Sequence, residues 1–204
     1  MYSFRNDYSE GAHPKVLQAL ADTNLRQTVG YGMDPCCQAA ADTIRRLCAA
    51  PDAAVHFLVG GTQVNLVTID AFLQSYEAVV AAQTGHVSTH ETGAIEATGH
   101  KVCTVESPDG KLTPALVESV LAGHNGTEHM VLPRMVYISD TTEIGTVYTR
   151  AELAALLEEA AARKGRHAAI RLNRPQAVLE VHFQEAPPAE ACTAQEANEG
   201  EEEG

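Results

Sequence analysis

A short apolar run that stops at two glycines constrains the fold more than any other feature of this chain. Residues 55–59 are mostly apolar or β-branched, and apolar residues return at helical spacing from Asn65 onward. The sequence therefore predicts a strand, a tight turn at Gly60 and Gly61, and a helix. Repeated units of this kind build an α/β fold.

The same junction is a candidate anion site. Gly60 and Gly61 let the backbone approach a ligand closely, Thr62 adds a hydroxyl, and the first amides of a helix have no partner within it. The pattern alone also fits a plain strand-to-helix turn. A nucleotide-binding loop is a further alternative, but the three-glycine spacing and the acidic residue typical of such loops are missing.

Strands and helices alternate along the rest of the chain. Several expected strands are apolar throughout, which is typical of a mostly parallel sheet covered on both faces, so we expect a three-layer α/β/α architecture. The expected strands are 78–82, 101–105, 135–139 and 176–183, and the expected helices are 14–24, 36–49, 92–98, 113–121 and 150–163. Residues 168–172 look like a poor strand.

Two finer expectations concern the helices. The helix over 36–49 should bury Ile44, Leu47 and Cys48 on one face, and Thr113 is a plausible N-cap for the helix that follows it. The segment from His86 to His90 reads as a loop, because Gly85 and two β-branched residues do not favour a helix.

Composition narrows the class of protein. With 204 residues, 45% of them hydrophobic, the chain can bury one full core. No apolar run is long enough to span a bilayer, and the first residues lack the basic and apolar regions of a secretory signal. Five cysteines without CxxC spacing indicate reduced thiols and a cytoplasmic location.

The net charge of −13 is unevenly distributed. Seven acidic residues and no Lys or Arg lie in 185–204, which leaves 20 acidic against 14 basic residues, a net charge of −6, before it. The body is only mildly acidic, so neither a nucleic acid nor an anionic membrane is expected as a partner. The tail is rich in Glu, Ala, Pro and Gly, and we expect it to be disordered.

Ordered motifs point to a family. Residues 5–7 (RND), 31–35 (YGMDP), 60–65 (GGTQVN) and 86–94 (HVSTHETGA) resemble, in the same order, four motifs of the threonine aldolases. These enzymes are β-eliminating lyases that use pyridoxal phosphate (PLP) and have the aspartate-aminotransferase-like fold, fold type I. The resemblance covers the N-terminal part of such an enzyme and implies a truncated fold type I large domain.

The resemblance assigns cofactor contacts. Gly60, Gly61 and Thr62 would hold the phosphate through backbone amides and one hydroxyl. His86 would stack on the pyridine ring and, in the family, also lies near the bond that is broken, so it is the candidate catalytic residue.

Four residues are implied to bind the amino acid substrate: Asn6, Tyr31, His90 and Glu91. Asn6 and His90 stand where the family has Ser and Tyr. Tyr31 would reach the active site of a neighbouring subunit in a homo-oligomer, dimer or tetramer, although a packed loop aromatic is an equal alternative. Glu91 would orient its neighbours or cap a helix. No third ligand accompanies His86 and His90, so no metal is expected.

Some groups of the family pattern are missing. The family places a Leu-Asp-Gly-Ala-Arg segment, whose Asp keeps the pyridine protonated, directly after the helix that matches 150–163, and a PLP-binding lysine further on. Neither motif is present, and none of the lysines lies in a matching context: Lys15, Lys101, Lys111 and Lys164.

This loss divides the chain into three parts. Residues 1–163 are the expected lyase part, 164–184 a divergent segment, and 185–204 the acidic tail. A frameshift or truncation would explain the abrupt change.

The resemblance implies cleavage of the Cα–Cβ bond of a β-hydroxy-α-amino acid to glycine and an aldehyde. Without its lysine and aspartate, this chain is expected to be inactive alone. Two alternatives remain open: a lyase that eliminates the side chain of an aromatic amino acid, and a non-catalytic half-enzyme that acts as a binding module.

Overall fold

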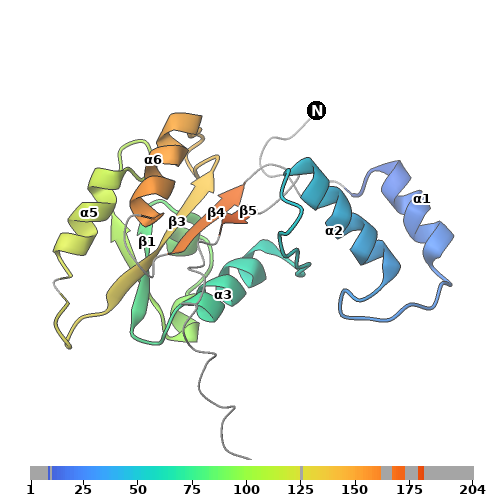
Figure 1. The fold of residues 1–204 in the computed structure, drawn as a ribbon, viewed down its shortest axis with the longest axis horizontal. Helices are drawn as coiled ribbons and strands as arrows, with labels where there is room; N and C mark the ends of the chain where they lie inside the picture. Colours follow the sequence, from blue (N-terminus) through green and yellow to red (C-terminus); the bar gives the residue numbers. More distant parts are fainter. Residues whose placement is uncertain (1–8, 10, 125, 162–166, 173–178, 182–204) are drawn as a thin grey trace, which may run out of the picture. The chain divides into compact units, whose positions relative to one another are not determined.

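The chain divides into two compact units, residues 1–58 and 59–204. They are seen in a computed structural model (Figure 1), which describes residues 9, 11–124, 126–161, 167–172 and 179–181. The expected acidic tail lies outside the described residues.

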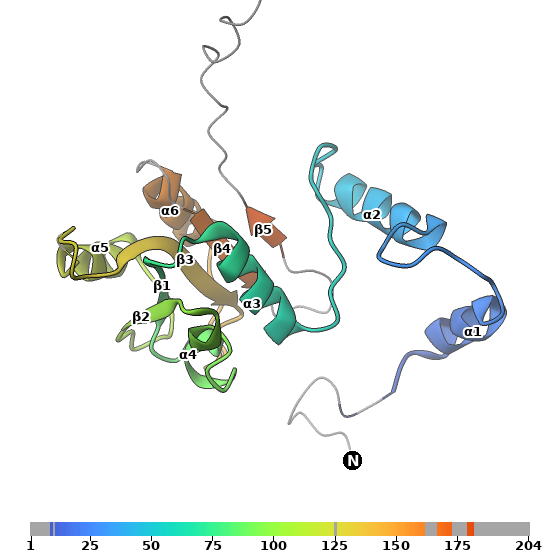
Figure 2. The ribbon, with the colours of Figure 1, turned by 90° about the horizontal axis from the view of Figure 1, so that it is seen from below.

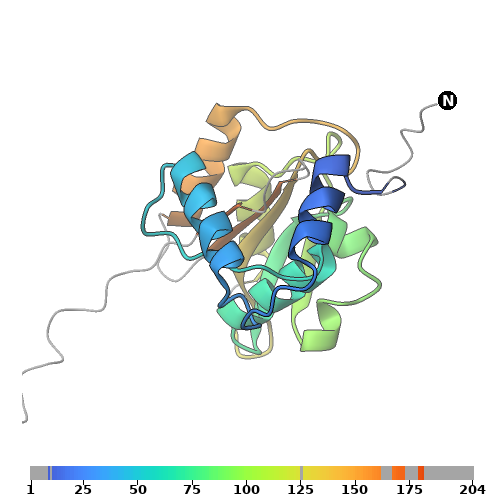
Figure 3. The same ribbon diagram turned by 90° about the vertical axis from the view of Figure 1, so that its right-hand side faces the viewer.

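The first unit contains two helices joined by a loop, drawn in blue in Figure 3: α1 (Pro14–Thr23) and α2 (Pro35–Leu47). Each begins with a proline, which has no N–H to leave unsatisfied in the first turn. The carboxylate of Asp34 accepts hydrogen bonds from the N–H groups of Cys36 and Cys37 and so caps α2.

The predicted buried face of α2 is largely wrong. Leu47 and Cys48 are exposed, Ile44 is half-buried, and Ala41 is the buried residue of this helix. Periodicity identifies an apolar stripe, but burial needs a partner. The described part of this unit holds two helices and no sheet for the stripe to cover.

The predicted strand over 55–59 is also absent. These residues have no regular structure, and the side chains of Phe57 and Val59 are exposed. A short apolar run carries strand propensity only when a neighbouring strand pairs with it, and none of the described strands does.

The second unit is built on a five-stranded sheet in the order β2-β1-β3-β4-β5. β1, β2, β3 and β4 run parallel, and β5 pairs antiparallel with β4. The strands are β1 (Glu77–Ala82), β2 (Lys101–Val105), β3 (Leu132–Asp140), β4 (His167–Leu172) and β5 (Leu179–Val181). A mostly parallel α/β sheet is confirmed.

β4 corrects the expectation that residues 168–172 make a poor strand. Its pairing with β3 runs from Met135 opposite His167 to Asp140 opposite Leu172. Alanine has weak strand propensity, but a parallel partner that is itself buried overrides this preference.

Helices cover the sheet on both faces (Figures 1 and 2). On one face α3 (Gly61–Phe72) and α4 (His86–Thr89) pack on β1 and β3 through a cluster that includes Ile69, Val79 and Met135. On the other face α5 (Pro114–Ala122) and α6 (Arg150–Ala161) pack through a cluster that includes Val80 and Leu156. The three-layer expectation is met.

Local capping agrees with the sequence at α5 and differs near residue 92. Thr113 accepts a hydrogen bond from the N–H of Leu116 and caps α5, as predicted. The helix expected over 92–98 is reduced to a single 3₁₀ turn, Glu96–Thr98, because Thr92 (φ 53°) and Gly93 (φ 76°) are left-handed.

Candidate functional site

Polar residues gather at the carboxyl ends of β1 and β3 in the second unit. The chain leaves β1 at Ala82 and enters α4 at His86, and it leaves β3 at Asp140 into a loop that leads to α6. In open α/β sheets, ligands bind outside the carboxyl ends of the strands. The loops after β1 and β3 are therefore the expected place for a site.

The N-terminus of α3 is a candidate anion site. Gly60 is the N-cap, and no side chain in the described part of the chain caps the helix. Gln63 accepts a hydrogen bond from the N–H of Val59 at 2.9 Å, which shapes the turn before the helix. The backbone N–H groups of Gly61, Thr62 and Gln63 therefore precede the first intrahelical bond, from Val64 to Gly60.

Gly60 does not use the conformational freedom of glycine that the sequence suggests. Gly60 has φ −168°, which is ordinary extended backbone, so no turn conformation requires glycine there. A Cβ atom built on Gly60 would meet no atom of the described residues within 4 Å, apart from its two neighbours in the chain. What the position offers is open space in front of the helix, where a ligand can approach the amides.

His86 is the first residue of the one-turn helix α4, so the expectation of a loop over 86–90 is wrong for its first four residues. The N–H of His90 donates to the carbonyl of His86 at 2.9 Å and closes the turn. The His86 and His90 rings lie 5.4 Å apart between centroids. The free-energy cost of ordering a single helical turn is small when the turn packs on a sheet. Here Val87 of α4 is buried against β1.

Two carboxylates flank the His86 ring. Its Nδ1 lies 3.1 Å from Glu143 Oε1, and its Nε2 lies 3.6 Å from Glu91 Oε1. His90 Nε2 is 3.9 Å from the other oxygen of Glu143. The side chain of His86 is one-fifth exposed, whereas that of His90 is mostly exposed. The arrangement can hold and pass a proton at the imidazole of His86.

Glu91 links this ring to the anion site. It is buried, and Oε1 accepts a hydrogen bond from Asn65 Nδ2, one turn into α3. Asn65 Nδ2 also lies 3.4 Å from the hydroxyl of Tyr137 on β3. That Glu91 orients its neighbours stays a prediction, and Glu91 does contact both Asn65 and His86. The helix-capping alternative does not agree with the structure, because the next turn begins with Ile95 at its N-cap.

Glu143 was not singled out in the sequence. It is 57 residues from His86 and follows β3 within the segment Asp140-Thr141-Thr142-Glu143. A signal for it does exist: polar residues directly after a buried strand of a parallel sheet lie at the ligand-binding edge. The sequence motif alone does not say which of them meets His86.

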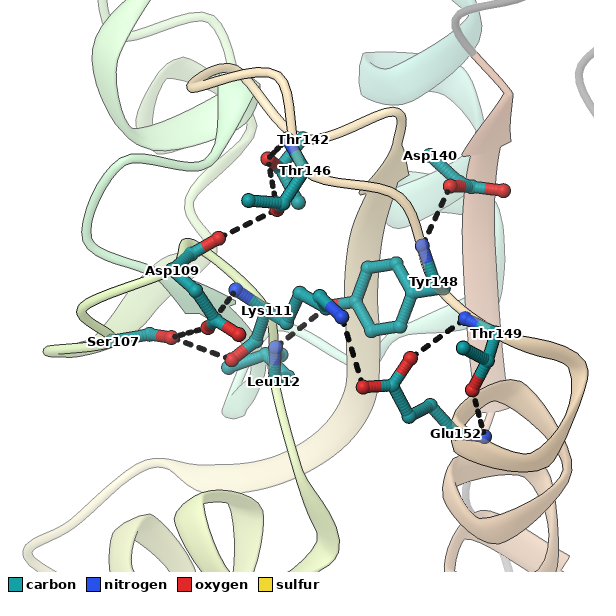
Figure 4. A network of polar contacts seen from close by, with 10 residues as sticks. All are labelled: Ser107, Asp109, Lys111, Leu112, Asp140, Thr142, Thr146, Tyr148, Thr149 and Glu152. Carbon is teal, nitrogen blue, oxygen red and sulfur yellow. Dashed lines mark hydrogen bonds and ion pairs between the residues drawn. The ribbon is translucent and has the colours of Figure 1, made fainter.

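A second polar network braces the same edge of the sheet, as Figure 4 shows. Lys111 Nζ lies 2.8 Å from Glu152 Oε1, and the hydroxyl of Tyr148 accepts a hydrogen bond from the N–H of Leu112 at 2.6 Å. Thr149 and Glu152 cap the first turn of α6 reciprocally. This network joins the loop before α5 to the loop before α6.

The charges in this brace are strongly coupled. The hydrogen bond from Lys111, followed by those from Thr149, lowers the pKa of Glu152 to about 2. Glu152 in turn raises the pKa of Lys111, mainly by accepting its hydrogen bond. Burial raises the pKa of Tyr148 well above its usual value, so its phenol stays neutral. Lys111 is thus held as a charged structural partner.

A small hollow of about 10 Å³ lies next to Tyr148 of the brace and Glu143. Its lining residues also include Thr84, Gly110 and Ser139. The buried hydroxyl of Ser139 makes no hydrogen bond to any other residue that the structure describes. The hollow therefore presents polar groups next to Glu143.

Two predicted substrate contacts do not belong to the described part of the second unit. Asn6 is outside the described residues. Tyr31 belongs to the first unit, where it is exposed with φ 62°. The structure thus brings together the α3 N-terminus, His86, Glu91 and, at the periphery, His90.

The residues present fit part of PLP. The uncapped amides of α3 and the Thr62 hydroxyl suit a phosphate dianion, and His86 supplies a ring that Glu91 and Asn65 connect to the same helix. Among the described residues of the second unit, no lysine accompanies them: Lys101 begins β2 at the opposite end of the strand, and Lys111 is paired with Glu152. Among the described residues no group of three potential ligands could hold a metal ion.

Comparison with known proteins gives close relatives. A low specificity L-threonine aldolase of Pseudomonas sp. (strain NCIMB 10558) is 36% identical over 155 residues, which is 75% of this chain and 44% of the relative. The solved threonine aldolase of Leishmania major is 52% identical, with a TM-score of 0.79 over 83% of this chain and 49% of that one. The chain thus spans about half the length of these relatives.

A more distant structure shares only the fold. It is described as a PLP-dependent β-cystathionase of Corynebacterium diphtheriae, is 17% identical, and has a TM-score of 0.56 over 78% of this chain and 41% of that one. Together with the Leishmania structure, it confirms the fold type I expectation.

The family model for beta-eliminating lyases matches residues 4–196. This match includes the anion site, His86, Glu91 and Glu143. PLP is the cofactor that this membership implies, in agreement with the expectation from the motifs. Nearly the whole chain therefore belongs to the beta-eliminating lyase family.

Proposed function

We propose that this chain carries the phosphate- and ring-binding part of a PLP-dependent lyase that cleaves the Cα–Cβ bond of a β-hydroxy-α-amino acid such as threonine. The observation that supports it best is the contact chain from α3 to His86. Asn65 of α3 holds Glu91, and Glu91 lies 3.6 Å from the ring of His86. The anion site and the imidazole are thereby built as one unit.

Each residue has a separate task in this proposal. The amides of Gly61 and Thr62, with the Thr62 hydroxyl, bind the phosphate, and Gly60 leaves them open to it. His86 faces the cofactor ring and handles the proton of the substrate hydroxyl. When bound, PLP supplies an electron sink for the electron pair released at the substrate Cα.

The names of the relatives favour threonine over an aromatic substrate. Both the Pseudomonas relative and the Leishmania structure are threonine aldolases. His86, flanked by Glu143 and Glu91, suits a substrate that carries a hydroxyl to be deprotonated. Elimination of an aromatic side chain does not start from such a hydroxyl, which makes it the weaker candidate.

The substrate class can be tested without turnover. The reduced conjugate of PLP with L-threonine is compared with those of L-alanine and L-tyrosine by isothermal titration. One hydrogen bond to the β-hydroxyl predicts about fivefold tighter binding of the threonine conjugate than of the alanine conjugate. His86→Ala should remove the difference. A preference for the tyrosine conjugate would instead support the aromatic lyase.

We also propose that this chain does not turn over threonine by itself. Lys111 is engaged with Glu152, and Lys101 begins the strand at the far end from the site. Treatment of the PLP complex with borohydride, followed by mass spectrometry, should leave no PLP attached to a lysine of this site. Stoichiometric trapping at one lysine, or threonine cleavage at the rate of a full-length relative, would contradict this proposal.

Assembly into a homo-oligomer is proposed on the apolar side chains that the first unit exposes, such as Leu20, Leu25 and Met33. Light scattering with size-exclusion chromatography tests it, and a monomer at all concentrations would argue against it. In the described residues no helix is long and apolar enough to cross a membrane. The free cysteines among them agree with the proposed cytoplasmic location.

A further inference from the structure

The two nitrogens of His86 have unequal partners. Nδ1 is 3.1 Å from Glu143 Oε1, within hydrogen-bond range, whereas Nε2 is 3.6 Å from Glu91 Oε1, beyond it. An ionised carboxylate only accepts hydrogen bonds, so the nitrogen that bonds to it must carry the proton. The neutral ring therefore has its proton at Nδ1.

We propose that Glu143 is a positioning residue that fixes His86 as the Nδ1–H tautomer and leaves Nε2 as the atom that accepts a proton. The proton-accepting role of Nε2 rests on the proposed function. The tautomer itself is a property of the protein without cofactor. The logic is that of a carboxylate that orients a catalytic imidazole in a hydrolase triad.

The turn that carries Glu143 is anchored on both sides. The N–H of Thr142 donates to the carbonyl of Thr146 at 2.9 Å, and the N–H of Gly145 donates to the carbonyl of Thr142 at 3.0 Å. The hydroxyl of Thr146 donates to the carbonyl of Asp109 at 2.6 Å (Figure 4). A carboxylate on such a closed turn can hold a ring orientation, and the Glu143 side chain is only 17% exposed.

Among the described residues, three titratable groups face the ring: Glu143 from the loop after β3, Glu91 from the loop after α4, and His90 at the end of α4. Glu91 is fixed by Asn65, so it stays beside Nε2. When Nε2 takes the proton of a substrate hydroxyl, the positive charge forms 3.6 Å from Glu91 Oε1, which stabilises it. Glu143 thus fixes which ring nitrogen carries the proton, and Glu91 stabilises the positive charge of the doubly protonated ring.

His90 has a smaller part. Its Nε2 is 3.9 Å from Glu143 Oε2, and its side chain is 59% exposed. A contact of this length in solvent orients little. Removal of His90 should therefore leave the His86 tautomer unchanged, which makes His90→Ala a matched control for the loss of Glu143.

The test is a long-range proton–nitrogen correlation spectrum of the ¹⁵N-labelled chain without cofactor. Spectra are followed upward in pH until the ring shifts stop changing, and His86→Gln assigns the signals. The wild-type chain should show a protonated Nδ1 and an unprotonated Nε2. Glu143→Ala should reverse the tautomer preference, Glu143→Gln should retain it because the amide oxygen still accepts, and His90→Ala should match the wild type.

A wild-type His86 protonated at Nε2 would overturn the proposal without any variant. An unchanged tautomer in folded Glu143→Ala would also overturn it. If Glu143→Ala does not fold, the wild-type tautomer decides. This test is independent of the proposed function. Failure to bind PLP would leave these spectra unaffected, because they are recorded without the cofactor. Binding of PLP by a chain with the opposite tautomer would refute only the role of Glu143.

Discussion

Two polar clusters lie at the same edge of the sheet, and they are built on different principles. In the brace around Tyr148 and Glu152, each acceptor meets a donor: Lys111 and the first amides of α6 meet Glu152, and the N–H of Leu112 meets Tyr148. Around His86, two carboxylates face one imidazole, and one ring nitrogen has no partner within hydrogen-bond distance among the described residues. In the first cluster the donors and acceptors pair with one another, whereas the second cluster can accept a proton at Nε2 of His86.

Lys111 of the brace lacks the features of a catalytic lysine. Its ammonium is held by Glu152, and its pKa is raised by that contact. A lysine that reacts with a carbonyl needs a lowered pKa, so that a neutral amine is present. At this edge of the sheet, the charge-paired residues of the brace therefore suit a structural role. The Nε2 atom of His86, with its lone pair free of any hydrogen bond from the described residues, suits proton transfer.

The largest effect should come from Asn65, which connects α3 to Glu91. Asn65→Leu removes the donor to a buried carboxylate and should lower the free energy of unfolding by about 2–3 kcal/mol. Urea denaturation followed by circular dichroism measures it. Asn24→Leu, at an exposed position, is the control and should change stability by less than about 0.5 kcal/mol. Equal losses of unfolding free energy in the two variants would contradict the role of Asn65 in connecting α3 to Glu91.

The brace should be the next most sensitive. Tyr148→Phe leaves the buried N–H of Leu112 without its acceptor and should cost about 1–2 kcal/mol. The matched control is Tyr76→Phe, because Tyr76 is 60% exposed. We expect the His86 spectra to be unchanged in Tyr148→Phe. A change there would mean that the two clusters are coupled.

Acid should weaken the brace through Glu152. Because its folded pKa is about 2, below the usual 4.5, its stabilisation is present above about pH 4.5 and is lost as the pH falls toward 2. The difference in unfolding free energy between the wild type and Glu152→Gln should therefore shrink over this range. A difference that stays constant from pH 5 to 2 would contradict the pairing with Lys111.

The smallest effect concerns the turn beside Glu91. Thr92 is β-branched and left-handed at φ 53°, which costs about 1–2 kcal/mol, while glycine loses about 0.5–1 kcal/mol in chain entropy. Thr92→Gly should therefore stabilise the fold by about 0.5 kcal/mol. Thermal unfolding, with Thr98→Gly as a control that should destabilise, measures the sign.

The sequence predicts β1, β2 and β3 well and β4 poorly. β1 and the central part of β3 are continuous apolar runs because both of their faces are buried. β4 is rich in alanine, and the run over 55–59 looks more like a strand, yet only β4 has a partner to pair with. Pairing is a non-local property that local propensity does not contain.

The site follows the same rule. His86, Glu91 and the α3 N-terminus stand in motifs that local sequence reveals. Glu143 reaches His86 only because β1 and β3 are adjacent and parallel in the sheet, which brings their carboxyl ends together. Its part in the site therefore required the fold.

Equilibrium titration of the 204-residue chain with PLP tests the central claim, that the α3 N-terminus and His86 form one cofactor site. The account predicts saturable binding that inorganic phosphate displaces. Thr62→Val should weaken it at least about tenfold through a lost bond to a charged phosphate, His86→Ala should weaken it independently, and His90→Ala should leave it nearly unchanged. Binding that is absent, or indifferent to both Thr62→Val and His86→Ala, would contradict the account.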